Sequence, residues 1–178
     1  MLVVGVSYAL KEIAPDLTEP PVRQAEHSIP KPETNPMARG RAFVIRKRVL
    51  LADDLGRVLS AAGTLLCESF DIVGMVSDGR TALEATLALE PDLVVLDVSM
   101  PGMSGIEVAK ELKTRGNKAK IVFLTVHEDS DILATCLAAG GRGYVVKVLM
   151  DTDLIPAIHE ALADRVFVSR LTSRQDSQ

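Results

Sequence analysis

The chain has 178 residues, 47% of them hydrophobic, and a formal net charge of −4. This length and composition indicate one globular domain with a substantial core plus some unstructured chain. The acidic balance gives no case for a general nucleic-acid-binding surface, and no apolar run approaches the roughly 20 residues of a membrane-spanning helix. Cys67 and Cys136 lie far apart without a CxxC pattern, so we expect reduced thiols in the core and a cytoplasmic location.

Residues 1–42 contain six of the nine prolines of the chain, all between Pro15 and Pro36. The stretch shows no sustained period of a helix or of a strand. We therefore expect it to be a disordered, proline-rich N-terminal extension.

From Arg48 onward, apolar strand-like runs alternate with helical patterns. The expected strands are RVLLAD at 48–53, FDIVGMV at 70–76, DLVVLD at 92–97, KIVFLT at 120–125 and GYVVK at 143–147. Helical patterns follow them at about 55–66, 81–90, 105–113, 131–140 and 152–164. The third helix is predicted to begin at a capping box, in which Ser104 and Glu107 satisfy each other's free amides.

Five strand–helix units in succession predict an α/β domain over residues 48–166. Three of the strands are apolar throughout and rich in β-branched residues, which is typical of a parallel sheet buried on both faces. Short connections and right-handed crossovers then favour a doubly wound sheet with helices on both faces. Residues 167–178 would be a linker remnant or a tail.

Polar residues stand where the expected strands end, and in an open parallel sheet the site lies outside the carboxyl ends of the strands. Asp53 and Asp54 end the first strand, Asp97 the third, Thr125 the fourth and Lys147 the fifth. Taken singly, each has a structural explanation, such as a helix cap, a β-branched strand residue or a solvated strand end. Their convergence on one rim instead indicates a shared site.

The chemistry of this rim points to phosphoryl transfer. Three clustered carboxylates repel one another and need a cation, and oxygen ligands without histidine or cysteine suit Mg²⁺. A carboxylate beside Mg²⁺ is a plausible nucleophile for a phosphoryl group, which gives an aspartyl phosphate. Lys147 and the Thr125 hydroxyl can then neutralise the other phosphoryl oxygens.

The stretches VLLADD, LVVLDVSMPGMSG, IVFLT and GYVVK, at these separations, resemble the receiver domain of a bacterial two-component response regulator, over residues 48–166. The MPGMSG and LTVHED stretches are most similar to the NarL/FixJ type. The resemblance implies a flavodoxin-like, five-stranded parallel sheet in the order 2-1-3-4-5. It also implies a signalling protein rather than an enzyme, with a sensor histidine kinase as its phosphodonor.

The resemblance assigns a role to each residue of the rim. Asp97 would be the phosphoacceptor, and Lys147 would pair with the phosphoryl group. Mg²⁺ would be held by Asp53, Asp54, Asp97 and the backbone carbonyl of Ser99.

A second group of residues would change conformation after phosphorylation. Thr125 and Tyr144 would be the switch pair, which remodels the surface of the fourth helix, fifth strand and fifth helix for a homodimer or a downstream protein. The alternative for Tyr144 is a strand aromatic with its hydroxyl in water. Ser99 and His127 occupy positions that tune the lifetime of the phosphoryl group, although His127 could equally be an exposed loop histidine.

One departure from the family concerns the residues after Lys147. Proline, or a small or acidic residue, is common there, whereas this chain has Val148 and Leu149. We therefore expect a different loop conformation and a more apolar output surface.

Two other functions remain open from the sequence. The ending VFVSRLTSRQDSQ resembles a linker and the first residues of a helix-turn-helix domain, so the chain could be a truncated transcription regulator, from which we expect no direct DNA binding. An aspartyl-nucleophile phosphatase could use the same rim, but such enzymes usually have Asp-x-Asp at the nucleophile. Here Asp97-Val98-Ser99 lacks the second acid.

Overall fold

The fold is known from a computed structural model that describes residues 45–170. The predictions for residues 1–42 and for the last eight residues of the chain lie outside this range. Across the described part, no helix combines the length and the apolar character needed to cross a bilayer.

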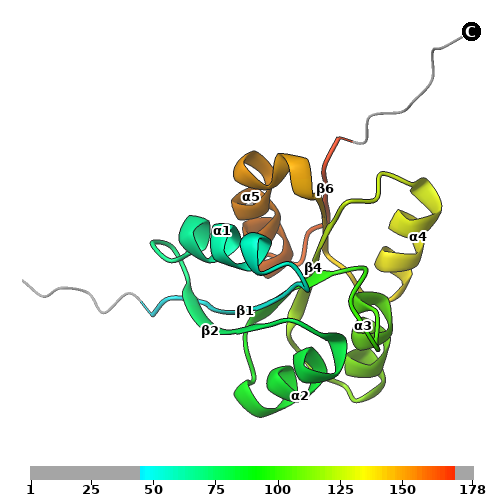
Figure 1. The fold of residues 1–178 in the computed structure, drawn as a ribbon, viewed down its shortest axis with the longest axis horizontal. Helices are drawn as coiled ribbons and strands as arrows, with labels where there is room; N and C mark the ends of the chain where they lie inside the picture. Colours follow the sequence, from blue (N-terminus) through cyan, green and yellow to red (C-terminus); the bar gives the residue numbers. More distant parts are fainter. Residues whose placement is uncertain (1–44, 171–178) are drawn as a thin grey trace, which may run out of the picture. The chain divides into compact units, whose positions relative to one another are not determined.

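A parallel sheet forms the centre of the domain (Figure 1). Its strands lie in the order β2-β1-β3-β4-β5-β6, and each pairs in parallel with its neighbour. The strands are β1 Arg48–Ala52, β2 Asp71–Val76, β3 Leu93–Asp97, β4 Lys120–Thr125, β5 Gly143–Val146 and β6 Phe167–Val168. The predicted order 2-1-3-4-5 is confirmed, and β6 adds a short strand at the β5 edge, beyond the predicted end of the domain.

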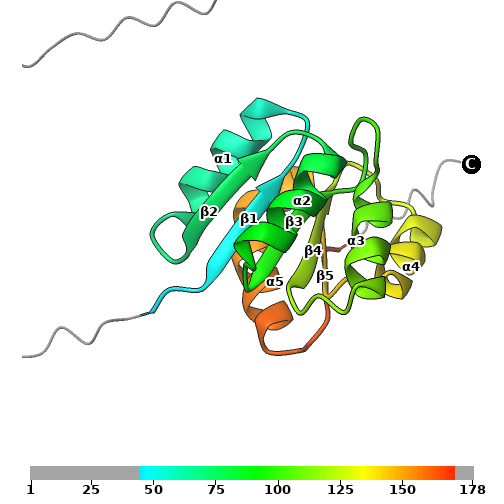
Figure 2. The same cartoon turned by 90° about the horizontal axis from the view of Figure 1, so that it is seen from below.

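Helices cover both faces of the sheet, as predicted. They are α1 Gly56–Leu66, α2 Gly79–Leu89, α3 Gly105–Thr114, α4 Ser130–Ala138 and α5 Met150–Leu162, with a 3₁₀ turn, η1 Lys147–Leu149, before α5. The helices α1 and α5 pack on one face, and α2, α3 and α4 pack on the other. Figures 1 and 2 show these two layers on opposite sides of the sheet.

The continuous apolar runs of the sequence follow from this burial on both faces. In β1, Val49 and Leu51 face the core under α1 and α5, whereas Leu50 and Ala52 face the opposite core. Successive side chains of a strand point to opposite faces, so a central strand needs apolar residues at every position. All five residues of β3 are buried, and the last of them is Asp97.

The sequence also predicted a capping box at the third helix and two buried cysteines, and the structure bears on both. The capping box is present: Ser104 Oγ accepts from the Glu107 amide, and the Glu107 carboxylate accepts from the Ser104 amide. Cys136 is buried in α4, as expected. The prediction that Cys67 is a core thiol is wrong, because Cys67 lies one residue past the last buried position of α1 and is exposed as its C-cap.

Candidate functional site

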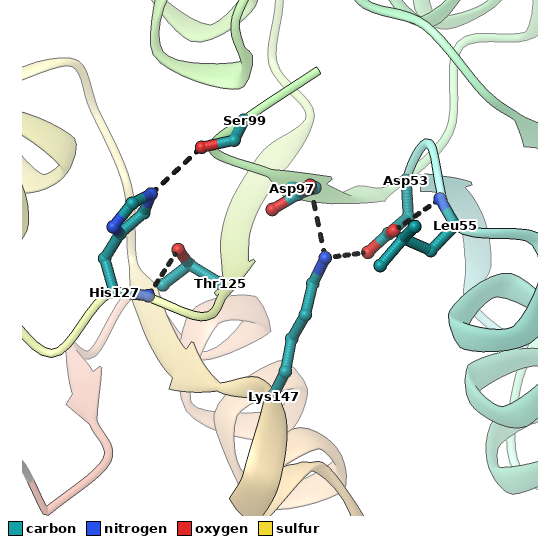
Figure 3. Close-up of polar contacts among 7 residues, drawn as sticks. All are labelled: Asp53, Leu55, Asp97, Ser99, Thr125, His127 and Lys147. Carbon is teal, nitrogen blue, oxygen red and sulfur yellow. Dashed lines mark hydrogen bonds and ion pairs between the residues drawn. The ribbon is translucent and has the colours of Figure 1, made fainter.

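The polar residues at the predicted strand ends meet at one edge of the sheet (Figure 3). Asp53 directly follows β1, Asp97 is the last residue of β3, Thr125 is the last residue of β4, and Lys147 directly follows β5. Because all these strands are parallel, their carboxyl ends lie at the same edge. The structure therefore brings together the residues that the sequence singled out.

Lys147 lies between two buried aspartates. Its Nζ is 2.7 Å from Oδ2 of Asp53 and 3.1 Å from Oδ2 of Asp97. The side chains of Asp53 and Asp97 are only 3% and 4% exposed, and that of Lys147 is 10% exposed. One ammonium group thus compensates two carboxylates in a place where an uncompensated charge is costly.

The second oxygen of each aspartate has a different environment. Oδ1 of Asp53 accepts a hydrogen bond from the Leu55 amide at 3.0 Å, which fixes the carboxylate at the start of α1. Oδ1 of Asp97 is buried and has no hydrogen-bond partner among the described residues. Asp97 therefore keeps one oxygen available for chemistry or for a cation.

The electrostatics of Asp97 also favour an added positive charge. Burial raises the pKa of Asp97 above its ordinary value; Lys147 opposes this rise, and the neighbouring Asp53 adds to it. A cation placed at the unpartnered oxygen would stabilise the ionised carboxylate.

Three aspartates could hold such a cation. Carboxylate oxygens of Asp53, Asp54 and Asp97 lie within 4.8 Å of one another, and Asp54 is exposed whereas the other two are buried. An all-oxygen set that is open to solvent on one side is the type that Mg²⁺ prefers, because this ion keeps several of its waters. The residues present thus fit the predicted magnesium site.

Ser99, His127 and Thr125 form a connected group on the other side of Asp97 (Figure 3). Ser99 Oγ lies 3.0 Å from Nε2 of His127. The backbone amide of His127 donates to Thr125 Oγ1 at 3.1 Å. The sequence favoured an exposed loop role for His127 over a role at the site, whereas the structure places the residue half-buried and in contact with Ser99.

Tyr144 lies inside the domain rather than on its surface. Its ring is fully buried, and its hydroxyl donates to the backbone carbonyl of His127 at 2.8 Å. Burial raises the pKa of Tyr144 to about 12, so the hydroxyl stays protonated and remains a donor. The alternative that this hydroxyl lies in water is therefore wrong.

Lys147 and the two residues after it form the 3₁₀ turn η1. Val148 in this turn is 82% exposed and Val126, directly after Thr125, is 61% exposed. Two apolar side chains are thus exposed beside the site.

Comparison with known proteins places these features in a family. Residues 49–159 match the family described as response regulator receiver domain. The chain is similar to the nitrate/nitrite response regulator protein NarL of Escherichia coli strain K12, with 33% identity over 68% of this chain and 57% of NarL. It is also similar to the transcriptional regulatory protein PdtaR of Mycobacterium tuberculosis, with 38% identity over 73% of this chain and 63% of PdtaR. The chain thus spans less than two thirds of either relative.

Solved structures with the same fold give a consistent result. The isolated REC domain of RcsB from Salmonella enterica serovar Typhimurium, in the presence of phosphomimetic BeF3-, has a TM-score of 0.66 and 27% identity, and the match covers 72% of this chain and 97% of that domain. The signal receiver domain of the putative response regulator NarL from Mycobacterium tuberculosis has a TM-score of 0.65 and 28% identity, over 67% of this chain and 98% of that domain.

Proposed function

This chain belongs to the response regulator receiver family of two-component signalling, and on that premise we propose that Asp97 accepts a phosphoryl group from a sensor histidine kinase. The observation that carries the proposal is the environment of Asp97. One of its oxygens is paired with Lys147, and the other is buried without a partner among the described residues. The match to a receiver solved with a phosphomimetic ligand supports the same reaction.

The proposed step is a displacement at phosphorus. An oxygen of the ionised Asp97 carboxylate attacks the phosphorus atom of the donor phosphohistidine. The new O–P bond forms as the P–N bond breaks, and the imidazole of the kinase leaves. Such a transfer requires mainly correct placement of the groups and neutralisation of the phosphoryl charge.

Lys147 and Thr125 would stabilise the phosphoryl oxygens. Lys147 Nζ already lies beside Oδ2 of Asp97, so its charge would stay next to a phosphoryl group bound there. Thr125 Oγ1 accepts from the His127 amide and keeps its own proton, which it can donate to a phosphoryl oxygen.

Mg²⁺ would be held by Asp53, Asp54 and Asp97, with the Ser99 backbone carbonyl as a further ligand. When bound, the ion supplies positive charge that neutralises phosphoryl oxygens. The close carboxylate oxygens and the unpartnered Oδ1 of Asp97 support this assignment.

The output would depend on Thr125 and Tyr144. When the Thr125 hydroxyl turns to the phosphoryl group, the packing around Tyr144 changes, and the balance between two conformations of α4, β5 and α5 shifts. We propose that this surface binds a second copy of the chain or a downstream protein. The name of the relative PdtaR, a transcriptional regulatory protein, supports transcription control as the final output of the pathway.

The test is phosphorylation by a small donor. The protein is incubated with acetyl phosphate and Mg²⁺, and its intact mass is measured. We expect one phosphoryl adduct on the unmutated chain and on Asp71→Asn, a control that removes an exposed carboxylate of β2. Asp97→Asn should carry no adduct. The adduct should form more slowly in Asp54→Asn, and more slowly in the unmutated chain when EDTA is present. An unmutated chain without an adduct, or an adduct that persists in Asp97→Asn, would contradict the proposal.

A further inference from the structure

His127 contacts three residues that belong to different parts of the site. Its ring nitrogen Nε2 lies 3.0 Å from Ser99 Oγ, in the segment that follows β3. Its amide donates to Thr125 Oγ1 at the end of β4, and its carbonyl accepts from the Tyr144 hydroxyl of β5. One residue therefore connects the segment after the phosphoacceptor with both members of the proposed switch pair.

We propose that His127 is a positioning residue whose contact with Ser99 sets the position of Tyr144. The carbonyl that holds the Tyr144 hydroxyl can stay in place only if the backbone of His127 stays in place. The backbone of His127 lies in the loop between β4 and α4. Val126, the residue before His127 in this loop, is 61% exposed. The ring contact with Ser99 ties this loop to the segment after β3 (Figure 3).

This contact gains importance when Thr125 changes its partner. In the conformation described here, Thr125 Oγ1 helps to hold the His127 amide. If the Thr125 side chain turns toward a phosphoryl group, its bond to the His127 amide weakens, and His127 is then held by the ring contact with Ser99 and by the Tyr144 hydroxyl itself. The Ser99–His127 contact would then decide how strongly phosphorylation and the position of Tyr144 are coupled, a consequence that rests on the proposed function.

The position of Tyr144 can be measured without phosphorylation. The chain has two tyrosines, Tyr8 and Tyr144, so Tyr8→Phe leaves one tyrosine to label. With 3-fluorotyrosine incorporated, a single ¹⁹F resonance reports whether the Tyr144 ring is buried. The variants are Ser99→Ala, His127→Ala and the double variant, with His127→Gln as a rescue that keeps a hydrogen-bonding group. Val126→Ala is the matched control, because it changes the same loop without touching the contact.

We expect Ser99→Ala and His127→Ala to move the resonance in the same direction, toward the position of exposed tyrosine, with no additional shift in the double variant. This non-additivity is expected because both changes remove the same contact. His127→Gln should lie closer to the unmutated position than His127→Ala, and Val126→Ala should leave the resonance unmoved. An unmoved resonance in Ser99→Ala, or additive shifts in the double variant, would overturn the inference.

The ¹⁹F experiment and the phosphorylation experiment test the two proposals separately. An adduct on Asp97 together with an unmoved resonance in Ser99→Ala would overturn the coupling alone. A missing adduct together with equal, non-additive shifts would overturn phosphorylation of Asp97 and leave the positioning role of His127 supported.

Discussion

Gly105 lies directly against the backbone of Asp97, so closely that a β-carbon at Gly105 would overlap the Asp97 carbonyl oxygen. The Gly105 amide also donates to the Val98 carbonyl at 3.0 Å. The first residue of α3 is thus packed onto the strand end that carries the proposed phosphoacceptor. The absence of a side chain at Gly105 is a condition for the position of Asp97.

Gly105→Ala should therefore damage both stability and the site. The added methyl group meets backbone atoms, which cannot move aside as a flexible side chain can. We expect a loss of about 1–3 kcal/mol in the free energy of unfolding, as for other overpacked sites, and slower adduct formation with acetyl phosphate. Urea unfolding and intact mass measure the two effects. Gly56→Ala is the control, since a β-carbon there meets no atom within 4 Å; equal effects of the two substitutions would refute this explanation.

Lys147→Met should destabilise the metal-free protein strongly. The substitution leaves two buried carboxylates, Asp53 and Asp97, without the ammonium group that lies between them. Loss of one partner of a buried ion pair typically costs about 3–5 kcal/mol. Because Mg²⁺ would replace part of the missing charge, added Mg²⁺ should restore more stability in Lys147→Met than in the unmutated chain. Urea unfolding in EDTA and in Mg²⁺ tests both expectations, with the exposed Lys118→Met as the control; a variant as stable as the control in EDTA would contradict them.

The two cysteines should differ in reactivity. Burial raises the pKa of Cys136 to about 11, so its thiol stays protonated near neutral pH, and the side chain is inaccessible. Cys67 is exposed. Because the thiolate is the reactive form, iodoacetamide should add one group to the folded protein, at Cys67, and a second only after unfolding. Peptide mass mapping locates the label, and rapid double labelling of the folded chain would disprove the buried position of Cys136.

Ser169→Ala should loosen β6. Ser169 Oγ donates to Asp153 Oδ2 at 2.6 Å and accepts from the Val146 amide at 3.3 Å, and the residue is almost fully buried. Its removal leaves the buried Val146 amide without this acceptor and the half-buried Asp153 carboxylate without this donor, at a cost of about 1–3 kcal/mol. Hydrogen exchange should become faster at the amides of Val146 and Phe167, and Ser77→Ala, at an exposed position, should leave it unchanged. Unchanged protection of Phe167 in Ser169→Ala would show that β6 does not depend on this side chain.

Asp92 should contribute stability that depends on pH. Partial burial alone would raise its pKa, but hydrogen bonds from Lys47 and from the Arg48 amide lower it below the usual 3.8. A carboxyl group with a lowered pKa in the folded state stabilises the fold above its unfolded pKa, and this contribution is lost as the pH falls through its folded pKa.

Asp92→Asn should therefore lower the urea midpoint near neutral pH, and the difference from the unmutated chain should shrink below pH 3.8. Asp151→Asn, an exposed position in α5, should show no such trend. A difference that stays constant over this range would mean that the charge of Asp92 is not the cause.

The rim of the site could be predicted from the sequence because it follows from two simple patterns. Each central strand is a continuous apolar run, and each run stops at a polar residue, so the positions of Asp97 and Thr125 at strand ends follow from the order of residues alone. Parallel strands then bring those ends to one edge.

Other features depend on tertiary contacts that leave no pattern. The strand β6 has only two residues, too few for a period, and Ser169 beside it is held by Asp153 and Val146 from α5 and β5. Because β5 is buried on both faces, alternation could not tell in which direction Tyr144 points. Cys67 continues the apolar pattern of α1 in the sequence. It is exposed because α1 ends one residue earlier, at Leu66.

The direction of β6 has a practical consequence for reporter design. The strand β6 runs parallel to β5, with Phe167 opposite Gly143. The carboxyl end of β6 therefore lies on the same side of the sheet as the carboxyl end of β5, where Lys147 is found. A fluorophore attached through Arg170→Cys, in a Cys67→Ser background, would thus stand on the same side of the domain as Asp97. An antiparallel strand of the same length would have carried the dye to the opposite end, out of range of any charge change at Asp97.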